Sequence, residues 1–317
     1  LAMTSIDAAI SKAQVLIFAP RIRKTGQDIK IEITSKFKDA TSSLKKGCIV
    51  IYALGAGFGG NSENTSLLEH VTGFKVGKNI SYFYYPLSKF PNHNSFIGSY
   101  DGNDNEILTK LLSNEPQKNF LTLVASEYLH AINILQKFSE RTSILEICKF
   151  AKDDKTKTNL NYNKIGELFL DEMIDGLYDL KALNNSFEGA TSLTYLINAS
   201  IKGIDSYIKK LVDEIRLILK KNELKASRTK ILLMWTLDSY EMKGEKIEKL
   251  LELETKLKDY IGDVESVQHP MDNFHNDKTT ILVTCSKYDL DYVMKNNKDH
   301  EVIIIKANPL CELISQK

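Results

Sequence analysis

The chain has 317 residues, with 42 lysines and arginines against 41 aspartates and glutamates and a hydrophobic content of 43%. This length suits two domains, or two joined by a helical connector, and this composition suits a globular protein that buries its own cores. A net charge of +1, with lysines spread thinly along the chain, argues against nucleic-acid binding. No apolar run reaches the roughly 18 residues of a membrane-spanning helix, and the start at Leu1 lacks a signal-peptide pattern, so we expect a cytoplasmic protein with no membrane partner.

The first part of the chain alternates between predicted strands and helices. Apolar runs predict strands at residues 15–19, 48–54 and 80–85. Apolar residues at helical spacing predict helices around 33–44 and at 62–72. This alternation is typical of a parallel sheet with right-handed crossovers.

The middle of the chain is predicted to be helical. Asn103 with Glu106 fits a capping box at the start of a helix over 103–114. Mostly helical segments follow at residues 126–152, 161–181 and 192–222. The last of them carries a continuous apolar stripe, formed by Leu193, Leu196, Ile197, Ile201, Ile204, Ile208, Leu211, Ile215 and Leu219. A helix with so wide an apolar face must be covered on more than one side.

The last part of the chain returns to alternating strands and helices. Strands are predicted at residues 230–235, 280–284 and 302–305, with a charged amphipathic helix at 241–260. The predicted fold class is therefore α/β with a helical middle region.

Several stretches carry a resemblance to a known family. They are the strand that ends at Pro20, the phrase Thr72-Gly73-Phe74-Lys75-Val76-Gly77, the phrase Ile97-Gly98-Ser99-Tyr100-Asp101, the helix at 192–222, and the strand start Lys230-Ile231-Leu232-Leu233. In order and spacing they resemble the UDP-glucose/GDP-mannose dehydrogenase family, and its UDP-N-acetylmannosamine type in particular. The resemblance implies a partial Rossmann-like parallel sheet at 1–118, a central helical dimerisation domain at 119–222, and a C-terminal Rossmann-like, nucleotide-binding-like α/β domain at 223–317.

The sequence departs from the family in the cofactor region. The family begins with a strand, a Gly-x-Gly-x-x-Gly turn and further strand units before the point that matches this chain's first strand. Those units hold the cofactor pyrophosphate on a helix N-terminus and the ribose on an acidic residue. The resemblance therefore implies an N-terminally truncated chain that needs no cofactor, with NAD bound only if a partner chain supplies the missing part.

The catalytic positions of the family carry other residues here. The resemblance implies a Pro-Glu pair after the third strand, and Leu87 stands in place of that glutamate. It also implies a Glu-x-x-Lys-x-x-x-Asn helix that begins at Glu127, with His130 in place of the lysine and Ile134 in place of the asparagine. The resemblance therefore implies a catalytically degenerate chain with no assigned catalytic residue.

The thiol chemistry of the family is also missing. The resemblance places the nucleophilic cysteine within residues 184–190, and the sequence has no cysteine between Cys148 and Cys285. A covalent mechanism does not survive the loss of its nucleophile. The chain's four cysteines, which include Cys48 and Cys311, form no Cys-x-x-Cys pair, and this argues against a zinc site or a disulfide framework.

One glycine pattern is a weak cofactor candidate. Gly55, Gly57 and Gly60 match Gly-x-Gly-x-x-Gly between a strand and a helix, which is the arrangement of a dinucleotide-binding loop. The acidic partner that should end the next strand is absent from residues 84–88. The loop is therefore either a phosphate cradle or a turn, and the turn is the simpler interpretation.

Other polar groups allow two interpretations each. Glu127 and His130, at i,i+3, are either a general base with its neighbour or a satisfied polar contact. His269 and His275 are a weak metal-ligand pair, and residues 101–106 resemble a calcium loop only superficially. We assign no metal site.

The sequence predicts a non-catalytic homologue of the nucleotide-sugar dehydrogenases that acts as a subunit, scaffold or nucleotide-sugar binder. Two alternatives stay open, namely oxidation of a nucleotide sugar in complex with a separate NAD-binding chain, or an enzyme of changed chemistry. We expect a homodimer through residues 192–222, because of their apolar stripe. The apolar strand at 15–19, as a sheet edge, also favours association, and a paralogous dehydrogenase subunit is a further candidate partner.

Overall fold

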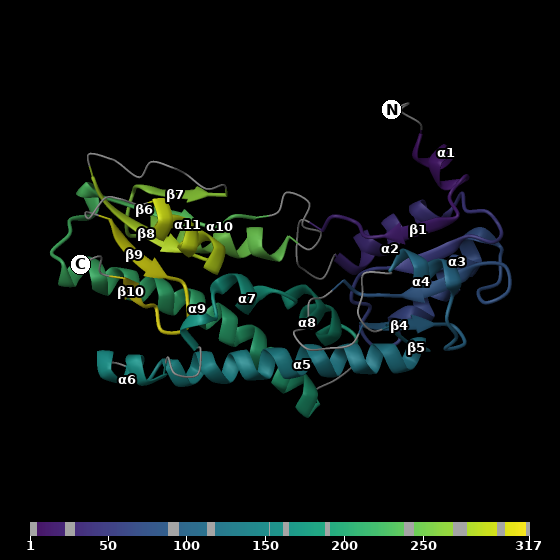
Figure 1. Cartoon of the computed structure of the whole chain (residues 1–317), viewed down its shortest axis with the longest axis horizontal. Helices are drawn as coiled ribbons and strands as arrows, with labels where there is room; N and C mark the ends of the chain where they lie inside the picture. Colours follow the sequence, from purple (N-terminus) through teal and green to yellow (C-terminus); the bar gives the residue numbers. More distant parts are fainter. Residues whose placement is uncertain are drawn as a thin grey trace. The chain divides into compact units, whose positions relative to one another are not determined.

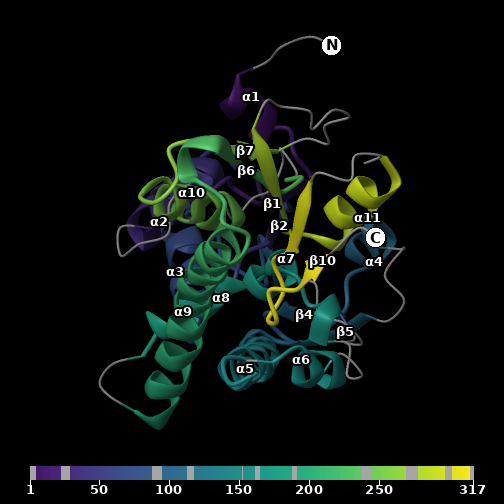
Figure 2. The ribbon, with the colours of Figure 1, turned by 90° about the vertical axis from the view of Figure 1, so that its left-hand side faces the viewer.

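The computed structural model describes residues 5–22, 29–87, 95–112, 118–151, 153–160, 165–187, 191–237, 244–268, 278–296 and 302–314. These residues form two five-stranded sheets with helices around them (Figure 1, Figure 2). The chain divides into two compact units: unit 1 comprises residues 1–137 and 176–197, and unit 2 comprises residues 138–175 and 198–317. No helix within the described ranges is long and apolar enough to cross a membrane.

Unit 1 is built on a mixed sheet. Its strands are β1 (Val15–Phe18), β2 (Ile49–Tyr52), β3 (Ser81–Tyr84), β4 (Ser95–Ser99) and β5 (Lys118–Thr122), and they lie side by side in chain order. β1, β2 and β3 are parallel, which confirms the sequence prediction for these strands. β4 runs antiparallel to β3 and parallel to β5, and neither β4 nor β5 is predicted from the sequence.

Helices cover both faces of this sheet. They are α1 (Ile6–Ile10), α2 (Ile29–Thr41), α3 (Gly60–Thr72), α4 (Glu106–Leu111), the first part of α5 (Leu123–Cys148) and α8 (Leu177–Asn184). Because side chains alternate across a strand, Tyr52 packs with Phe37 of α2 on one face and Ile51 packs with Leu108 of α4 on the other. Burial on both faces explains why β2 reads as a continuous apolar run.

The start of α4 differs from the prediction. The N-cap residue is Asn105, whose Oδ1 accepts hydrogen bonds from the backbone N–H groups of Ile107 at 3.0 Å and Leu108 at 3.1 Å. Asn103 instead donates its Nδ2 to Asp101 Oδ2 at 2.7 Å. The predicted capping box at Asn103 is therefore wrong, because that side chain closes the turn that precedes the helix.

Unit 2 is built on a second sheet that is mostly parallel. Its strands are β6 (Thr229–Met234), β7 (Val264–Val267), β8 (Thr279–Thr284), β9 (Ile303–Lys306) and β10 (Leu313–Ile314), in the order β10-β9-β8-β6-β7. Only the pairing of β10 with β9 is antiparallel. The strands predicted at 230–235, 280–284 and 302–305 are confirmed as β6, β8 and β9. The sequence analysis does not predict β7 and β10.

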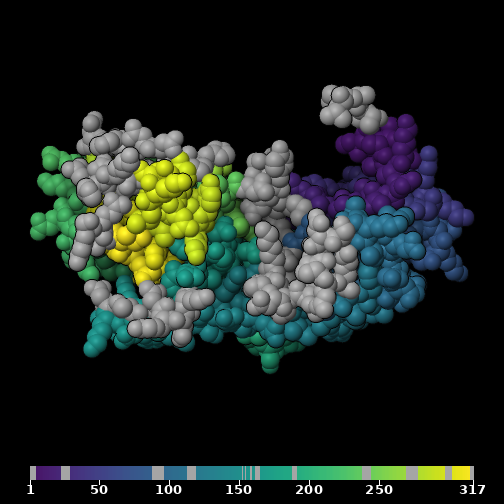
Figure 3. Space-filling model, viewed as in Figure 1, coloured from purple at the N-terminus to yellow at the C-terminus, as the bar shows by residue number. Residues whose placement is uncertain are grey.

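The helices of unit 2 are α6 (Asp154–Leu160), α7 (Leu170–Ile174), α10 (Glu245–Lys258), α11 (Lys287–Asn296), the second part of α5 and most of α9 (Ser192–Lys221). Val293 of α11 packs against Leu282 and Ile304 on one face of the sheet. Ile281 and Val283 point to the other face and are also fully buried, so both faces are covered. The C-terminal residues that include α11 lie at the surface in yellow in Figure 3.

The apolar stripe of α9 is covered by the chain itself. Five of its residues have no exposed surface, namely Ile197, Ile204, Ile208, Leu211 and Ile215. At Gly203 an added Cβ would lie 2.8 Å from Cγ2 of Thr142, so α5 and α9 pack closely there. Leu196 and Leu217 stay exposed on α9. The homodimer through residues 192–222 stays a prediction. Its apolar contacts would have to come from exposed residues such as Leu196 and Leu217.

Candidate functional site

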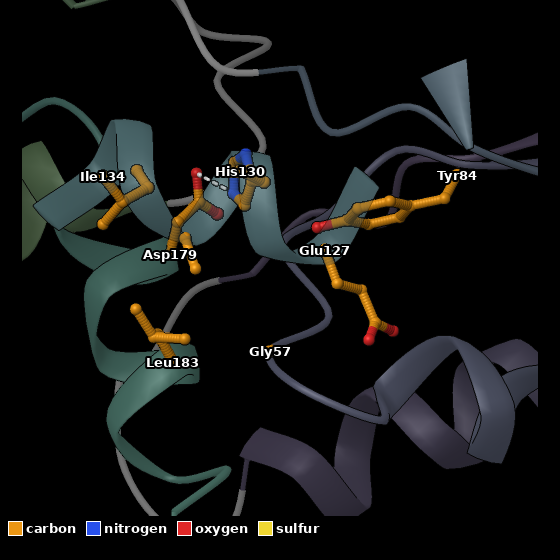
Figure 4. A pocket seen from close by; sticks show the side chains of 8 residues that line it. Gly57, Tyr84, Glu127, His130, Ile134, Asp179 and Leu183 are labelled. Carbon is orange, nitrogen blue, oxygen red and sulfur yellow. Dashed lines mark ion pairs between the residues drawn. The ribbon is translucent and has the colours of Figure 1, made fainter. Parts of the chain in front are cut away.

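A small cavity in unit 1 lies where the glycine loop meets α5 and α8 (Figure 4). It is lined by Gly57 of the loop, Tyr84 of β3, Glu127, His130, Ala131 and Ile134 of α5, and Asp179 and Leu183 of α8. The cavity has a volume of about 10 Å³, which is room for roughly one water molecule. Four of the residues that the sequence singles out therefore meet in one place, namely Gly57, Glu127, His130 and Ile134.

An ion pair between His130 and Asp179 lies at the centre of this cavity. His130 Nε2 is 3.8 Å from Asp179 Oδ2, the contact dashed in Figure 4. The imidazole is 10% exposed and the carboxylate is fully buried. The sequence does not single out Asp179, because it lies on α8, far from His130 along the chain.

Glu127 of α5 binds the start of α3 through both of its carboxylate oxygens. Oε2 accepts a hydrogen bond from the N–H of Gly59 at 2.9 Å, and Oε1 accepts one from the N–H of Asn61 at 2.8 Å. Gly59, at φ +73°, is the N-cap residue of α3. A carboxylate is favourable at this end of a helix because of the helix dipole and the free N–H groups. The anion position at the glycine loop is thus filled by a side chain of the same unit.

Other N–H groups of the loop also bind side chains of unit 1. The N–H of Ala56 donates to Tyr84 Oη at 3.3 Å, and the N–H of Phe58 donates to Ser186 Oγ at 3.1 Å. A phosphate cradle uses such N–H groups for its ligand, and in this structure those of Ala56, Phe58, Gly59 and Asn61 already bind side chains.

The glycines of the loop have a packing explanation. An added Cβ at Gly55 would lie 2.6 Å from Asp179 Oδ1, so the backbone must approach α8 closely there. Gly57 has φ +71°, and its added Cβ would lie 2.9 Å from Cβ of Ser186. At Gly60 the added Cβ would lie 2.9 Å from Cβ of Ala56. The Gly-x-Gly-x-x-Gly pattern therefore follows from the tight turn and from the contact with α8.

Tyr84 joins the loop to the cavity. Its ring lies edge-on to the His130 ring, with the ring centroids 6.1 Å apart. Burial raises the pKa of Tyr84 well above its ordinary value of 10.0, and the charges of Asp179 and Glu127 raise it further. The phenol therefore stays neutral and acts as a hydrogen-bonding group near two carboxylates.

Solved structures resemble this chain along nearly its whole length, although no protein-family model and no curated protein sequence matches it. A UDP-glucose dehydrogenase from Pyrobaculum islandicum has a TM-score of 0.61 at 13% identity, over 96% of this chain and 79% of that one. The UDP-D-ManNAc dehydrogenase from Pyrococcus horikoshii has a TM-score of 0.58 at 11% identity, with coverage of 96% and 79%. An NDP-N-acetyl-D-galactosaminuronic acid dehydrogenase from Methanosarcina mazei has a TM-score of 0.55 at 14% identity, with coverage of 96% and 76%.

The chain has the fold of a nucleotide-sugar dehydrogenase. This confirms the predicted α/β class with two Rossmann-like sheets. Sequence identities this low show the fold, and function has to be argued from the residues of the site.

Two residues that the sequence resemblance places at catalytic positions, Leu87 and Ile134, are apolar. Ile134 is buried in the wall of the cavity. Leu87 is 45% exposed, and its N–H donates to the carbonyl oxygen of Ala53 at 3.1 Å. Neither side chain can move a proton, so proton transfer would depend on His130, Asp179 or Glu127.

The thiols of the chain are all buried. Cys48, Cys148, Cys285 and Cys311 are each free and buried. Burial is the largest influence on all four and raises the pKa of each thiol, that of Cys311 to about 12. Within the region of the expected nucleophile, residues 184–187 are described and contain no cysteine, and 188–190 lie outside the described residues.

The metal-ligand candidates do not form a described site. His269 and His275 lie outside the described residues. The Asp101 carboxylate accepts hydrogen bonds from the backbone N–H and from Nδ2 of Asn103, and it therefore serves the turn before α4. Among the residues that the structure places, no three His, Cys, Asp or Glu side chains are grouped to hold a metal ion.

A polar cluster lies at the carboxyl ends of β6 and β8 in unit 2, where open α/β sheets usually bind ligands. Asp289 is fully buried and accepts hydrogen bonds from Thr236 Oγ1 at 2.6 Å and from Ser286 Oγ at 2.5 Å. Burial raises the pKa of Asp289, although these hydrogen bonds oppose the rise. Nearby, Lys246 Nζ lies 2.7 Å from Asp171 Oδ1. Asp289 is thus held by two hydroxyl groups, and Lys246 is paired with Asp171.

Proposed function

We propose that this protein is a non-catalytic relative of the nucleotide-sugar dehydrogenases that acts as a subunit, scaffold or nucleotide-sugar binder. The observation that carries the proposal is the burial of all four cysteines, with the pKa of each thiol raised by burial. The oxidation that the resemblance implies captures an aldehyde on a thiolate. A nucleophilic thiolate needs solvent access and a lowered pKa, and these thiols have the opposite properties.

The glycine loop supports the same proposal. Its N–H groups at Gly59 and Asn61 bind the Glu127 carboxylate. A cofactor phosphate would have to displace a charged acceptor whose two hydrogen bonds are already short and well placed. The adjoining cavity of about 10 Å³ holds roughly one water molecule, far less than a sugar ring. We therefore interpret Gly55, Gly57 and Gly60 as a structural turn.

The subunit version of the proposal needs a partner, which is a second copy of this chain or a paralogous dehydrogenase chain. Four free cysteines accord with a reducing compartment, and we therefore propose a cytoplasmic location.

Exposed apolar residues on α9, among them Tyr195 and Leu217, support association of two chains through this helix. Light scattering of the purified chain tests the second-copy version, because a stable species at the chain mass of 35.9 kDa excludes a homodimer.

Calorimetric titration with UDP and with NAD separates the binder from the scaffold. The nucleotide-sugar binder should bind UDP with a dissociation constant below about 100 μM, which is about 5.5 kcal/mol. A scaffold should give no heat of binding with either ligand. Tight NAD binding by the isolated chain would contradict the proposal, because the loop donors would then have to be available to a cofactor.

A further inference from the structure

His130 of α5 and Asp179 of α8 lie close together in the wall of the unit 1 cavity. Their charged atoms are 3.8 Å apart, with the imidazole 10% exposed and the carboxylate fully buried. Attraction between charges is much stronger in such a dry place than at the surface. The protonation state of His130 therefore has a large effect on the contact between α5 and α8.

The ionisable groups that face His130 are otherwise acidic or neutral. Asp179 comes from α8, Glu127 from α5 itself, and Tyr84 from β3, while the loop contributes Gly57. The Glu127 carboxylate is compensated by two backbone N–H groups. Among the residues that line the cavity, His130 is the one that can carry a positive charge beside the buried carboxylate of Asp179.

Asp179 also lies where α8 contacts the glycine loop. The Gly55 backbone approaches the Asp179 carboxylate so closely that an added Cβ would lie 2.6 Å from Oδ1. At the far end of α8, Ser186 Oγ accepts from the N–H of Phe58. Loosening α8 would therefore release the loop as well, together with the edge-to-face contact of the Phe58 and Phe187 rings, whose centroids are 5.2 Å apart.

We propose that His130 and Asp179 form a pH-dependent lock that holds α8 against α5 and the glycine loop. With His130 protonated, the ion pair is complete and α8 is held. With His130 neutral, this attraction between the imidazole and the Asp179 carboxylate is absent and α8 opens more often. The sign follows from linkage: a histidine that is stabilised in its charged form contributes stability at low pH, and this contribution is lost as pH rises through its titration. The lock does not depend on the proposed function.

Hydrogen exchange of the full chain tests the lock. The measured quantity is the protection of the α8 amides, residues 177–184, between about pH 5.5 and pH 8.5, corrected for the intrinsic rate. We expect protection to fall about tenfold over this range, which is a loss of about 1.4 kcal/mol in the free energy of opening. In His130→Gln, which cannot take up a charge, protection should be independent of pH. The matched control is His70→Gln, at an exposed histidine of α3, which should behave as the unmodified chain.

The unmodified chain provides a second, independent measurement. In a proton NMR titration, the His130 ring should titrate at a higher pH than the ring of a short unstructured histidine peptide in the same buffer. If His130→Gln does not fold, this titration decides alone. The proposal is overturned if His130 titrates below the histidine of that reference peptide, or if α8 protection changes equally with pH in the unmodified chain and in His130→Gln.

Discussion

Removal of the Glu127 carboxylate is the sharpest test of how the glycine loop is held. In Glu127→Ala, the N–H groups of Gly59 and Asn61 lose their acceptors. Asn61 is 1% exposed, so water cannot replace its bond, whereas Gly59 is exposed and can bind water. Leaving the buried donor unpaired costs about 1–3 kcal/mol, and the loss of a charge at the helix start adds about 0.3–1 kcal/mol. We therefore expect a loss of about 1–4 kcal/mol in the stability of unit 1.

The assay has to report on unit 1 alone, because the chain has two compact units and need not unfold in one step. The single tryptophan, Trp235, belongs to unit 2, so its fluorescence serves as an internal reference. Hydrogen exchange of the α3 amides, residues 60–72, reports the opening free energy of unit 1 directly. The unfolding of Trp235 in urea should be unchanged.

The matched control is Glu63→Ala, on the first turn of the same helix. Glu63 forms an exposed ion pair with Lys30, with side-chain exposures of 62% and 66%. Such a pair contributes less than about 1 kcal/mol. Equal losses for Glu127→Ala and Glu63→Ala, or no loss for Glu127→Ala, would refute the account of the loop as a side-chain-capped turn.

Three further predictions concern packing, the long helix and pH. Gly57→Ala should destabilise unit 1 by about 1–2 kcal/mol more than Gly59→Ala. Both glycines have a positive φ, but only Gly57 lies against α8. Equal losses of hydrogen-exchange protection in the two variants would contradict the contact between Gly57 and α8. Ile204→Lys, at a fully buried position, should unfold unit 2 by Trp235 fluorescence rather than yield a folded monomer in light scattering. The pKa of Glu69 is lowered from 4.5 by its hydrogen bond with Lys75 and then by that with the Val76 N–H, so its stabilisation is present above pH 4.5 and lost as pH falls through the lowered value. In urea titrations, Glu69→Gln should therefore be less stable than the unmodified chain at neutral pH and equal to it in acid, and a difference that persists in acid would disprove the role of the charge.

The buried parallel strands are the part of the fold that sequence predicts well. β2, β6 and β8 are covered on both faces, and their runs of valine, isoleucine and leucine follow directly from that burial. The strands β4 and β5 are missed because their sequences, SFIGS and KNFLT, are short and partly polar. Gly98 in β4 is explained only by a distant neighbour, since an added Cβ there would lie 2.2 Å from Ser126 Oγ.

The candidate site is only partly visible in the sequence. His130 and the glycine loop stand out by residue type and spacing, but their partners depend on the tertiary fold. In the sequence, Asp179 is indistinguishable from an ordinary helix residue. Only the folded structure brings it next to His130. Glu127 reads as a neighbour of His130, whereas its carboxylate binds the N–H groups of α3. Long-range contacts of this kind are set by topology, which local spacing does not encode.

The most direct test of the central claim is turnover by the isolated chain. The purified protein is incubated with NAD and a set of UDP-hexoses, including UDP-glucose, and the reduced nicotinamide is followed by absorbance beside an active UDP-glucose dehydrogenase. The account predicts no reduced cofactor above the enzyme-free control, since every thiol is buried with a raised pKa. Reduced nicotinamide that forms in proportion to the amount of this protein would contradict it.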